Sequence, residues 1–415
     1  MQILAIVPIV LIVAFVFGEL CKRIGLPSVI GQILAGILFG VPLLENLLFS
    51  DSPTLLIIDF LATLGILLLL FLAGLEIDIE KIKETSRDSI LISMSSALLP
   101  FLLGFVFLTV FFPQYGLLTA LVFGGALMVT SEATKVKVLM DLNSLNTRLG
   151  AVMLAAGAID DVFEVLFLSI VVVMAKGGGF TELARVPLEM LLFIVVAFIS
   201  FKVISKVLRH LDKTSGDETE LFSIVMIFVL VLAALSESLN VGYLIGAIIG
   251  GFLLQASMKD ISRRQKRNLI TEVKLVALGF VVPFFFVNVG LRFDFSTFYS
   301  NIPLVAATVI LAFLGKMVGT LIVKPFSSLS WGQLYYTGWA MNSRGAAELV
   351  IALVAVQYGL IPLEIYSALV AMSLITTLTF PPVLARGIRK NHELMDGTLG
   401  KPRLDIMGKL KWSKR

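Results

Sequence analysis

The sequence predicts an all-α polytopic membrane protein with about thirteen transmembrane helices. Three observations predict this fold class: the composition, the length of the apolar runs, and the alternation of basic residues between the loops. Of the 415 residues, 58% are hydrophobic and 15% are charged, and the mean hydropathy is +0.99. A soluble chain of this length cannot bury so much apolar surface. Cys21 is the single cysteine, which excludes a disulfide framework.

The apolar runs are long enough to cross a bilayer, whose hydrocarbon core requires about 20 apolar residues of helix. The first run lacks a basic n-region and a small-residue cleavage site, so we expect a retained helix rather than a signal peptide. The second and ninth runs are short and rich in glycine. The expected spans are residues 3–21, 27–41, 54–75, 89–112, 116–138, 147–175, 186–208, 220–238, 241–256, 270–290, 302–323, 331–356 and 363–385.

Basic residues lie mainly in alternate loops, which are the cytoplasmic loops by the positive-inside rule. The opposite loops, 42–53, 113–115, 239–240 and 357–362, carry no lysine or arginine. This pattern predicts an N-terminus outside and a C-terminus inside the cell, and an odd number of helices agrees with it. Arg292 is an exception, which we interpret as an interfacial helix cap. The net charge of +4 reflects cytoplasmic loops rather than nucleic-acid binding.

The two halves of the chain resemble each other at a separation of about 215 residues. The glycine-rich motif at 25–38 recurs at 241–253, and the motif at 72–79 recurs at 288–295. The matched positions are Gly31 with Gly246, Gly36 with Gly251, Gly74 with Gly290, and Asp78 with Asp294.

Six helices, one connecting helix and six further helices place such halves in opposite orientations across the membrane. Two inverted six-helix repeats are typical of transporters, whose substrate site lies at the midplane between broken helices. We expect a first inverted repeat at 1–175, a connecting helix at 176–215, a second inverted repeat at 216–386, and a basic cytoplasmic tail at 387–415.

The fifth and twelfth expected helices occupy equivalent places in the repeats, and polar residues interrupt each of them. Backbone at membrane depth unwinds only where protein or a cavity satisfies its polar groups. We therefore expect crossed broken helices whose dipole ends face the site. The charges of Glu132 and Arg344 offset either each other or the half-helix ends. The alternative places Glu132 and Lys135 at a cytoplasmic helix end. The residues of this broken-helix site are Thr130, Ser131, Glu132, Asn342, Ser343 and Arg344.

Asp160 and Asp161 lie inside the apolar run 150–174. A carboxylate at this depth costs at least about 2.5–3.5 kcal/mol on insertion scales and marks a functional site by default. Lys316 also lies deep inside an apolar span. We expect it to pair with one of the aspartates rather than to extend to an interface. The pattern predicts a cation and proton site, and the alternative is a buried ion pair that fixes helix packing.

Two glutamates are candidates for a supporting role. Glu164 lies one turn beyond Asp160 on the same helix face, and it either lines the ion path or pairs with Arg344. Glu348 follows the interruption of the twelfth helix. Because hard cations prefer oxygen ligands, the expected ligands of Na⁺ are Asp161, Asp160, Thr130 and Ser131, together with unwound backbone carbonyls.

Together and in order, these motifs resemble the monovalent cation:proton antiporter superfamily, and within it the second branch (the CPA2 family), over residues 5–386. The resemblance implies the NhaA-like antiporter fold, and a homodimer with a core domain and a dimerisation domain in the inner membrane of a prokaryote. It also implies elevator-like alternating access. The motifs that carry it are Gly25–Gly36, Phe71–Glu76, Thr130-Ser131, Asp160-Asp161, Lys316 and Arg344-Gly345.

In this family the second aspartate binds the ion and the first pairs with the lysine, which implies these roles for Asp161, Asp160 and Lys316. An Asp-Asp pair implies electrogenic Na⁺/H⁺ exchange. The chain departs from the family's pattern at Gln32 and Glu132, which leaves the ion specificity open. The resemblance implies no cofactor besides the transported Na⁺ (or Li⁺ or K⁺) and H⁺. We expect no nucleotide-binding regulatory domain of the Kef type, because little sequence follows Arg386.

We therefore expect a secondary active transporter that exchanges Na⁺ for protons, with membrane lipid and a second copy as its partners. The alternatives within transport are a K⁺/H⁺ antiporter and a Na⁺-coupled solute symporter. An enzyme is not expected, since an intramembrane aspartyl protease needs aspartates on two different helices. A channel is a further alternative, which exchange against a gradient would exclude.

Overall fold

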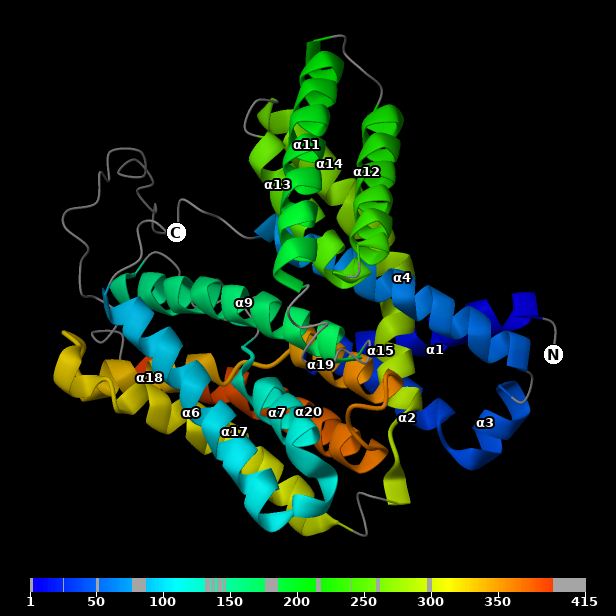
Figure 1. Ribbon diagram of the computed structural model, residues 1–415. Coiled ribbons are helices and arrows are strands. Elements are labelled where there is room, and N and C mark those ends of the chain that lie inside the picture. The colour runs from blue at the N-terminus through cyan, green and yellow to red at the C-terminus, as the bar shows by residue number, and fades with distance from the viewer. Residues whose placement is uncertain are drawn as a thin grey trace, which may run out of the picture.

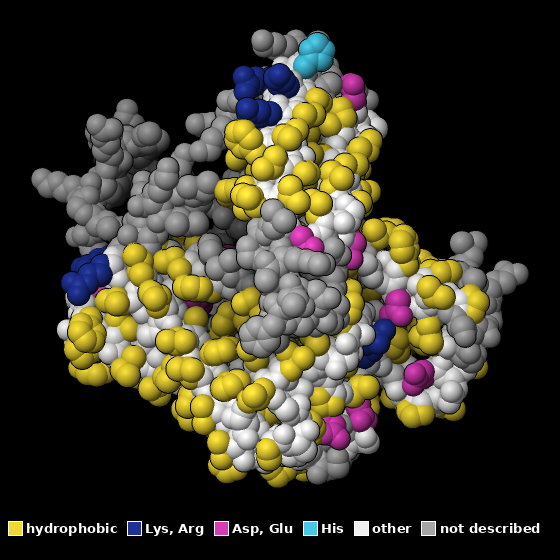
Figure 2. Space-filling view, viewed as in Figure 1, with side chains coloured by type: hydrophobic (Ala, Val, Ile, Leu, Met, Phe, Trp, Pro, Cys, Tyr) yellow, Lys and Arg dark blue, Asp and Glu magenta, His cyan; other side chains and the backbone are white. Residues whose placement is uncertain are grey.

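The computed structural model describes residues 3–24, 26–49, 52–76, 87–130, 135, 139, 144, 147–175, 186–213, 218–239, 241–258, 262–296 and 301–390. All regular secondary structure in these residues is helical, as predicted. Eight of the described helices are long and apolar enough to cross a membrane, or nine if the bent pair α2 (Ser28–Phe39) and α3 (Pro42–Leu48) is one span. Figure 2 shows hydrophobic side chains over the sides of the helices, and lysines and arginines gathered near their ends. The chain is a multi-pass membrane protein.

The first helix group packs around α4 and α13. In Figure 1, α11 to α14 stand together at the top, while α1 to α4 lie to the right. The group consists of α1 (Ile3–Arg23), α2, α3, α4 (Ser52–Glu76), α11 (Val186–Lys213), α12 (Glu218–Ser238), α13 (Tyr243–Ser257), α14 (Arg263–Val276), the π-helical turn η3 (Ala277–Val281) and α15 (Val282–Leu291).

The second helix group packs around α6 and α17 and occupies the lower left of Figure 1. Contacts within each group are more extensive than those between the groups, where α13 packs against α9. The second group consists of α6 (Arg87–Phe111), the short turn η1 (Pro113–Tyr115), α7 (Gly116–Met128), α9 (Arg148–Ala175), α17 (Ile302–Leu321), η4 (Lys324–Phe326), α18 (Trp331–Met341), α19 (Ala346–Gln357) and α20 (Leu363–Lys390).

Matched glycines pack the helices of one expected repeat against those of the other. Gly36 of α2 lies so close to α15 that a β-carbon would stand 2.1 Å from a carbonyl oxygen of that helix, and Gly290 of α15 makes the reciprocal approach. In the same way, Gly251 of α13 lies against α4, with 2.1 Å to a carbonyl oxygen, and Gly74 of α4 lies against α13. Only glycine permits such close backbone approach. The contact of α2 with α15 thus has a counterpart in that of α13 with α4.

Each of the thirteen predicted spans has a helix, or a pair of half-helices, as its counterpart. Some of these helices are shorter, more interrupted or more polar than a simple membrane-spanning helix. α2, α7 and α13 are short, α18 and α19 are two halves of one span, and α9 carries three carboxylates. Of these helices, α7, α9, α18 and α19 build the site described below, whereas α2 and α13 belong to the first helix group.

Candidate functional site: a buried ion pair at interrupted helices

Lys316 and Asp160 form an ion pair inside the second helix group. Lys316 lies on α17 and Asp160 lies in the middle of α9, and the distance from Nζ to Oδ2 is 3.2 Å. The two side chains are 0% and 2% exposed. Lys316 therefore does not extend to an interface. The expected pairing of this lysine with an aspartate of the apolar run is present in the structure, and the partner is Asp160.

Hydroxyl groups from two other segments complete the hydrogen bonding of this pair. Thr130, two residues beyond the end of α7, donates from Oγ1 to Asp160 Oδ2 at 2.7 Å and accepts from Lys316 Nζ at 2.6 Å. Ser93 of α6 donates to Asp160 Oδ1 through a short hydrogen bond. Both carboxylate oxygens are therefore satisfied, which a buried ion pair needs to offset the loss of solvent.

Both predicted helix breaks coincide with helix ends. α18 ends at Met341 and α19 begins at Ala346, so the break near 341–345 is confirmed. α7 ends at Met128, and the extended backbone of Val129 (φ −65°, ψ 147°) leads the chain away from the helix. Ser131 and Glu132 lie outside the described residues.

Arg344 lies fully buried in the break between α18 and α19, and it binds the end of α7. Its Nη1 donates to the carbonyl oxygens of Ala126 and Val129, and its Nη2 donates to that of Leu127 at 2.8 Å. The last carbonyls of a helix lack intrahelical partners and carry the negative end of its dipole. Arg344 therefore offsets a half-helix end, one of its two expected roles, and it does not direct these donors to Glu164.

Three further polar side chains lie in or against the interrupted segments. Asn342 Nδ2 donates to the Gly338 carbonyl at 2.9 Å, which satisfies a carbonyl in the last turn of α18. Lys135 is 0% exposed, and its Nζ donates to the Met153 carbonyl of α9 at 3.0 Å. This ammonium group is therefore buried against α9 rather than exposed to solvent. Ser343 is also fully buried.

A group of carboxyls surrounds the ion pair. Asp161 follows Asp160 on α9 and is partly exposed. Glu164, one turn further, lies within the electrostatic field of Asp161, Glu348 and Asp160. Glu348 is fully buried near the start of α19, and its Oε1 accepts from the Gly345 N–H at 2.8 Å. The two candidate supporting glutamates therefore lie beside the aspartate pair.

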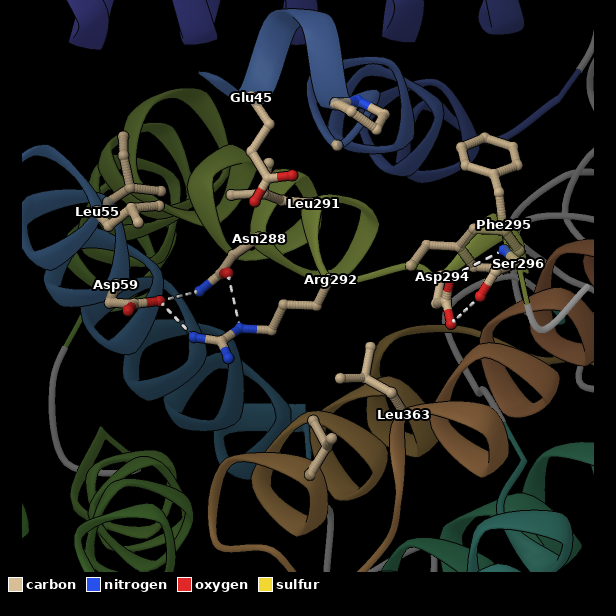
Figure 3. Close-up of a pocket in the computed structure, with 15 residues that line it drawn as sticks. Glu45, Leu55, Asp59, Asn288, Leu291, Arg292, Asp294, Phe295, Ser296 and Leu363 are labelled. Atoms are coloured by element: carbon tan, nitrogen blue, oxygen red, sulfur yellow. Dashed lines mark hydrogen bonds and ion pairs between the residues drawn. The ribbon is translucent and has the colours of Figure 1, made fainter. Parts of the chain in front are cut away.

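Arg292 forms a second ion pair, at the edge of a pocket of about 550 Å³. Its Nη2 lies 2.9 Å from Asp59 Oδ1, while Asn288 donates to the same oxygen and accepts from Arg292 Nε (Figure 3). The pocket lies between α3, α4 and α15 of the first helix group and residues Val356 and Leu363 of the second. Arg292 is therefore more than an interfacial cap.

Sequence reasoning missed Ser93 and Asp59. Ser93 belongs to a stripe of small polar residues along one face of α6, all fully buried, and this spacing within an apolar helix was the available signal. Asp59 is the one charge inside the apolar run of α4 before its last residue, so the reasoning applied to Asp160 also applies to it.

The arrangement is suited to exchanging charges rather than to holding a resident metal. Among the described residues, no group of three or more His, Cys, Asp and Glu side chains is placed to hold a metal ion. A cation entering beside Asp160 would therefore take hydroxyl or backbone carbonyl oxygens as well. The buried ammonium group of Lys316 already pairs with Asp160, so it must either move away when such a cation binds or exclude the cation.

Comparisons with known proteins agree with this geometry. Residues 9–386 match the family described as sodium/hydrogen exchanger, transmembrane. The chain is 30% identical over 386 residues to a Na⁺/H⁺ antiporter of Enterococcus hirae, which covers 92% of this chain and 97% of that protein. It is 28% identical to the Na⁺/H⁺-K⁺ antiporter GerN of Bacillus cereus, over 88% of this chain and 91% of that protein.

The fold is similar to that of the sodium proton antiporter MjNhaP1 from Methanocaldococcus jannaschii. The TM-score is 0.70 at 17% identity, over 96% of this chain and 99% of the other. The family match and the Enterococcus hirae relative confirm the superfamily, whereas the second branch is a finer assignment that stays a prediction. On the evidence of its sequence and its fold, the chain belongs to the sodium/hydrogen exchanger family.

Proposed function

We propose that the protein exchanges Na⁺ for protons across the membrane, electrogenically and by alternating access. The observation that carries this proposal is the Lys316–Asp160 pair, which is buried where the interrupted helices end and lies next to Asp161. Charged groups at this depth are costly, and a function that needs them there explains their presence. Two relatives are named as Na⁺/H⁺ and Na⁺/H⁺-K⁺ antiporters, which supports the same function.

The proposed cycle has two states. In the closed state Lys316 pairs with Asp160, and Asp161 carries a proton. In the open state one Na⁺ binds Asp161 and Asp160 with oxygens of Thr130 and Ser131. Lys316, now desolvated and unpaired, releases its proton, as Asp161 does. Two protons then leave for each Na⁺ that enters, which moves a net charge across the membrane. Asn342, Ser343 and Arg344 hold the interrupted backbone around this site, and the role of Glu132 stays open.

The experiment is cation-driven proton movement in proteoliposomes, with Na⁺, Li⁺ and K⁺ compared. Asp161→Asn keeps the size of the side chain and removes its charge, so exchange should vanish in a folded protein. Asp59→Asn is the matched control, because it makes the same change at an ion pair outside the proposed site. Exchange at the native rate in Asp161→Asn would show that the ion site lies elsewhere.

A K⁺/H⁺ antiporter is the second candidate, because the relative GerN is named for K⁺ as well as Na⁺. The same proteoliposomes separate the two, since the exchanged cation alone dissipates the imposed pH gradient. They also test a Na⁺-coupled solute symporter, which would remain inactive in liposomes that contain no organic solute.

We infer that residues 1–175 and 216–386 are inverted repeats, joined by the connecting segment 176–215. The reciprocal glycine contacts support this, because Gly36 and Gly251 hold equivalent places and meet equivalent backbone. Gly36→Val and Gly251→Val should therefore destabilise the protein by similar amounts, about 1–3 kcal/mol for overpacking. Gly279→Val is the control, since a β-carbon there meets nothing within 4 Å. A large cost at only one of the two glycines would count against equivalence.

We also propose a homodimer in a prokaryotic inner membrane, with the N-terminus outside, the C-terminus inside, and the second helix group moving against the first. The separate packing of the two groups supports the motion. Labelling of Arg23→Cys from one side of vesicles tests the topology, because Arg23 is exposed at the end of α1 and this end is expected in the cytoplasm. The single native cysteine, Cys21, is buried and is replaced by serine in this variant. Labelling only from the outside would show that the proposed orientation is wrong.

Cross-linking in native membranes tests the dimer, and a product of monomer mass at every cross-linker concentration would refute it.

A further inference from the structure

Glu348 presents one carboxyl oxygen that is bonded and one that is not. The side chain is fully buried at the start of α19. Its Oε1 accepts from the Gly345 N–H at 2.8 Å and from Ser373 Oγ of α20 at 2.7 Å. Among the residues that the structure describes, no donor lies within hydrogen-bond distance of Oε2. This asymmetry is the one expected of a protonated carboxyl, with Oε1 as the carbonyl oxygen and Oε2 as the hydroxyl.

The closest arginine does not neutralise this carboxyl by direct contact. Arg344 precedes Glu348 by four residues, but its Nη1 and Nη2 donate to carbonyls of α7. An ionised carboxylate that is buried without a contacting cation is costly, and such a group usually takes up a proton instead.

Glu348 also faces the proposed ion site. α9 packs against α19 and brings Asp160, Asp161 and Glu164 to this side. α17 brings Lys316, and Arg344 lies in the preceding break. The hydroxyls of Ser373 and Thr377 come from α20. With a proton on Glu348, the surroundings of Asp160 carry one negative charge fewer, so a change of that proton alters how strongly the site holds Na⁺.

We propose that Glu348 is a third proton-carrying group of the exchanger, which holds a proton in the closed state and releases it as Na⁺ binds. It adds one proton to the two that Asp161 and Lys316 release for each Na⁺. This inference rests on the proposed function. In the step, the O–H bond at Oε2 breaks and the proton passes to water of the opened site. Na⁺ enters at Asp161, so the charge of the cluster is unchanged by this pair of events. Arg344 and the positive end of the α19 dipole then stabilise the carboxylate that is left.

The test is infrared difference spectroscopy on the purified full chain, recorded with and without Na⁺. Asp161 and Glu348 each hold a proton in the proposed closed state, so the carbonyl bands of two protonated carboxyls should disappear on Na⁺ addition in the unchanged protein. The Glu348 band alone should be missing from Glu348→Gln. Asp88→Asn is the control, because both oxygens of the Asp88 carboxyl are hydrogen-bonded by Ser328, so the band should remain. The proton release per bound Na⁺ should fall by one proton in Glu348→Gln and stay the same in Asp88→Asn.

A second variant keeps the inference testable if Glu348→Gln does not fold. Ser373→Ala removes one hydrogen bond from Oε1, so the band should move to higher frequency. The inference would be overturned if both carbonyl bands persisted in Glu348→Gln, if neither band shifted in Ser373→Ala, or if only one band responded to Na⁺ in a chain that binds Na⁺. The proposed function fails separately, if the unchanged protein neither binds Na⁺ nor releases protons.

Discussion

The protein contains two ion pairs of similar length in opposite surroundings. The pair of Lys316 with Asp160 spans 3.2 Å with side chains 0% and 2% exposed. The pair of Arg292 with Asp59 spans 2.9 Å with side chains 35% and 42% exposed. Coulomb's law alone would rank them almost equally, since the distances are close. Burial separates them, because it weakens screening and makes the loss of one partner costly.

This difference shows which of the two ion pairs can couple its opening to the binding of a cation or a proton. A half-exposed pair is screened by water and ions and contributes little to stability. A buried pair leaves a strongly unfavourable charge whenever it opens, so a cation or a proton that relieves this charge can drive the change of state. We therefore assign coupling to the inner pair and a local positioning role, at the edge of its pocket, to the outer pair.

The largest expected effect follows from opening the inner pair permanently. Asp160→Asn leaves Lys316 without a charged partner in a fully buried site, at a cost of about 3–5 kcal/mol in the free energy of unfolding. Thermal unfolding of the purified protein measures this as a lower Tm. A Tm within experimental error of the unchanged protein would mean that the pair is solvated in the membrane.

A smaller effect is expected at the arginine that holds the end of α7. Arg344→Lys keeps the charge, but a single ammonium cannot reach the carbonyls that the guanidinium binds through two nitrogens. Leaving buried acceptors unsatisfied should cost about 1–3 kcal/mol. The same unfolding assay checks this cost, and exchange in proteoliposomes should weaken with it. If Arg344→Lys were as stable as the unchanged protein, the carbonyls at the end of α7 would not need the Arg344 guanidinium.

The smallest effect is expected at the outer pair. Asp59→Asn retains an oxygen that can accept from Asn288 and Arg292, and an exposed pair contributes about 0.2–1 kcal/mol. The Tm should move little, and the small difference should shrink further as ionic strength rises. A loss as large as that of Asp160→Asn would erase the distinction between the two regions.

Much of the fold could be predicted from the sequence, because membrane insertion leaves strong local signals. Apolar run length located the helices, and charges within those runs located Lys316 and Asp160 without any knowledge of packing. The interruption at 342–345 was predictable, since Asn342, Ser343 and Arg344 break an apolar span. Matching glycines indicated that the two halves of the chain are related, but their packing of α2 on α15 was not predicted.

The remaining contacts could not be predicted, because one of the partners has no distinctive side chain. Arg344 binds backbone carbonyls, which every residue carries. Ser93 donates to Asp160 across helices far apart in sequence, and serine is common in apolar helices where it bonds its own backbone. The pairing of Arg292 with Asp59 required the three-dimensional arrangement of α4 and α15.

The most direct test of the central claim is the voltage response of Lys316→Gln in valinomycin-clamped proteoliposomes. The account assigns one of the exchanged protons to Lys316, so the folded variant should still exchange Na⁺ for H⁺ but move one positive charge fewer in each cycle. Its rate should therefore respond less steeply to membrane potential. A static structural bridge would instead leave a less stable protein whose remaining exchange keeps the voltage response of the unchanged protein. Unchanged voltage dependence in folded Lys316→Gln would contradict Lys316 as a proton carrier.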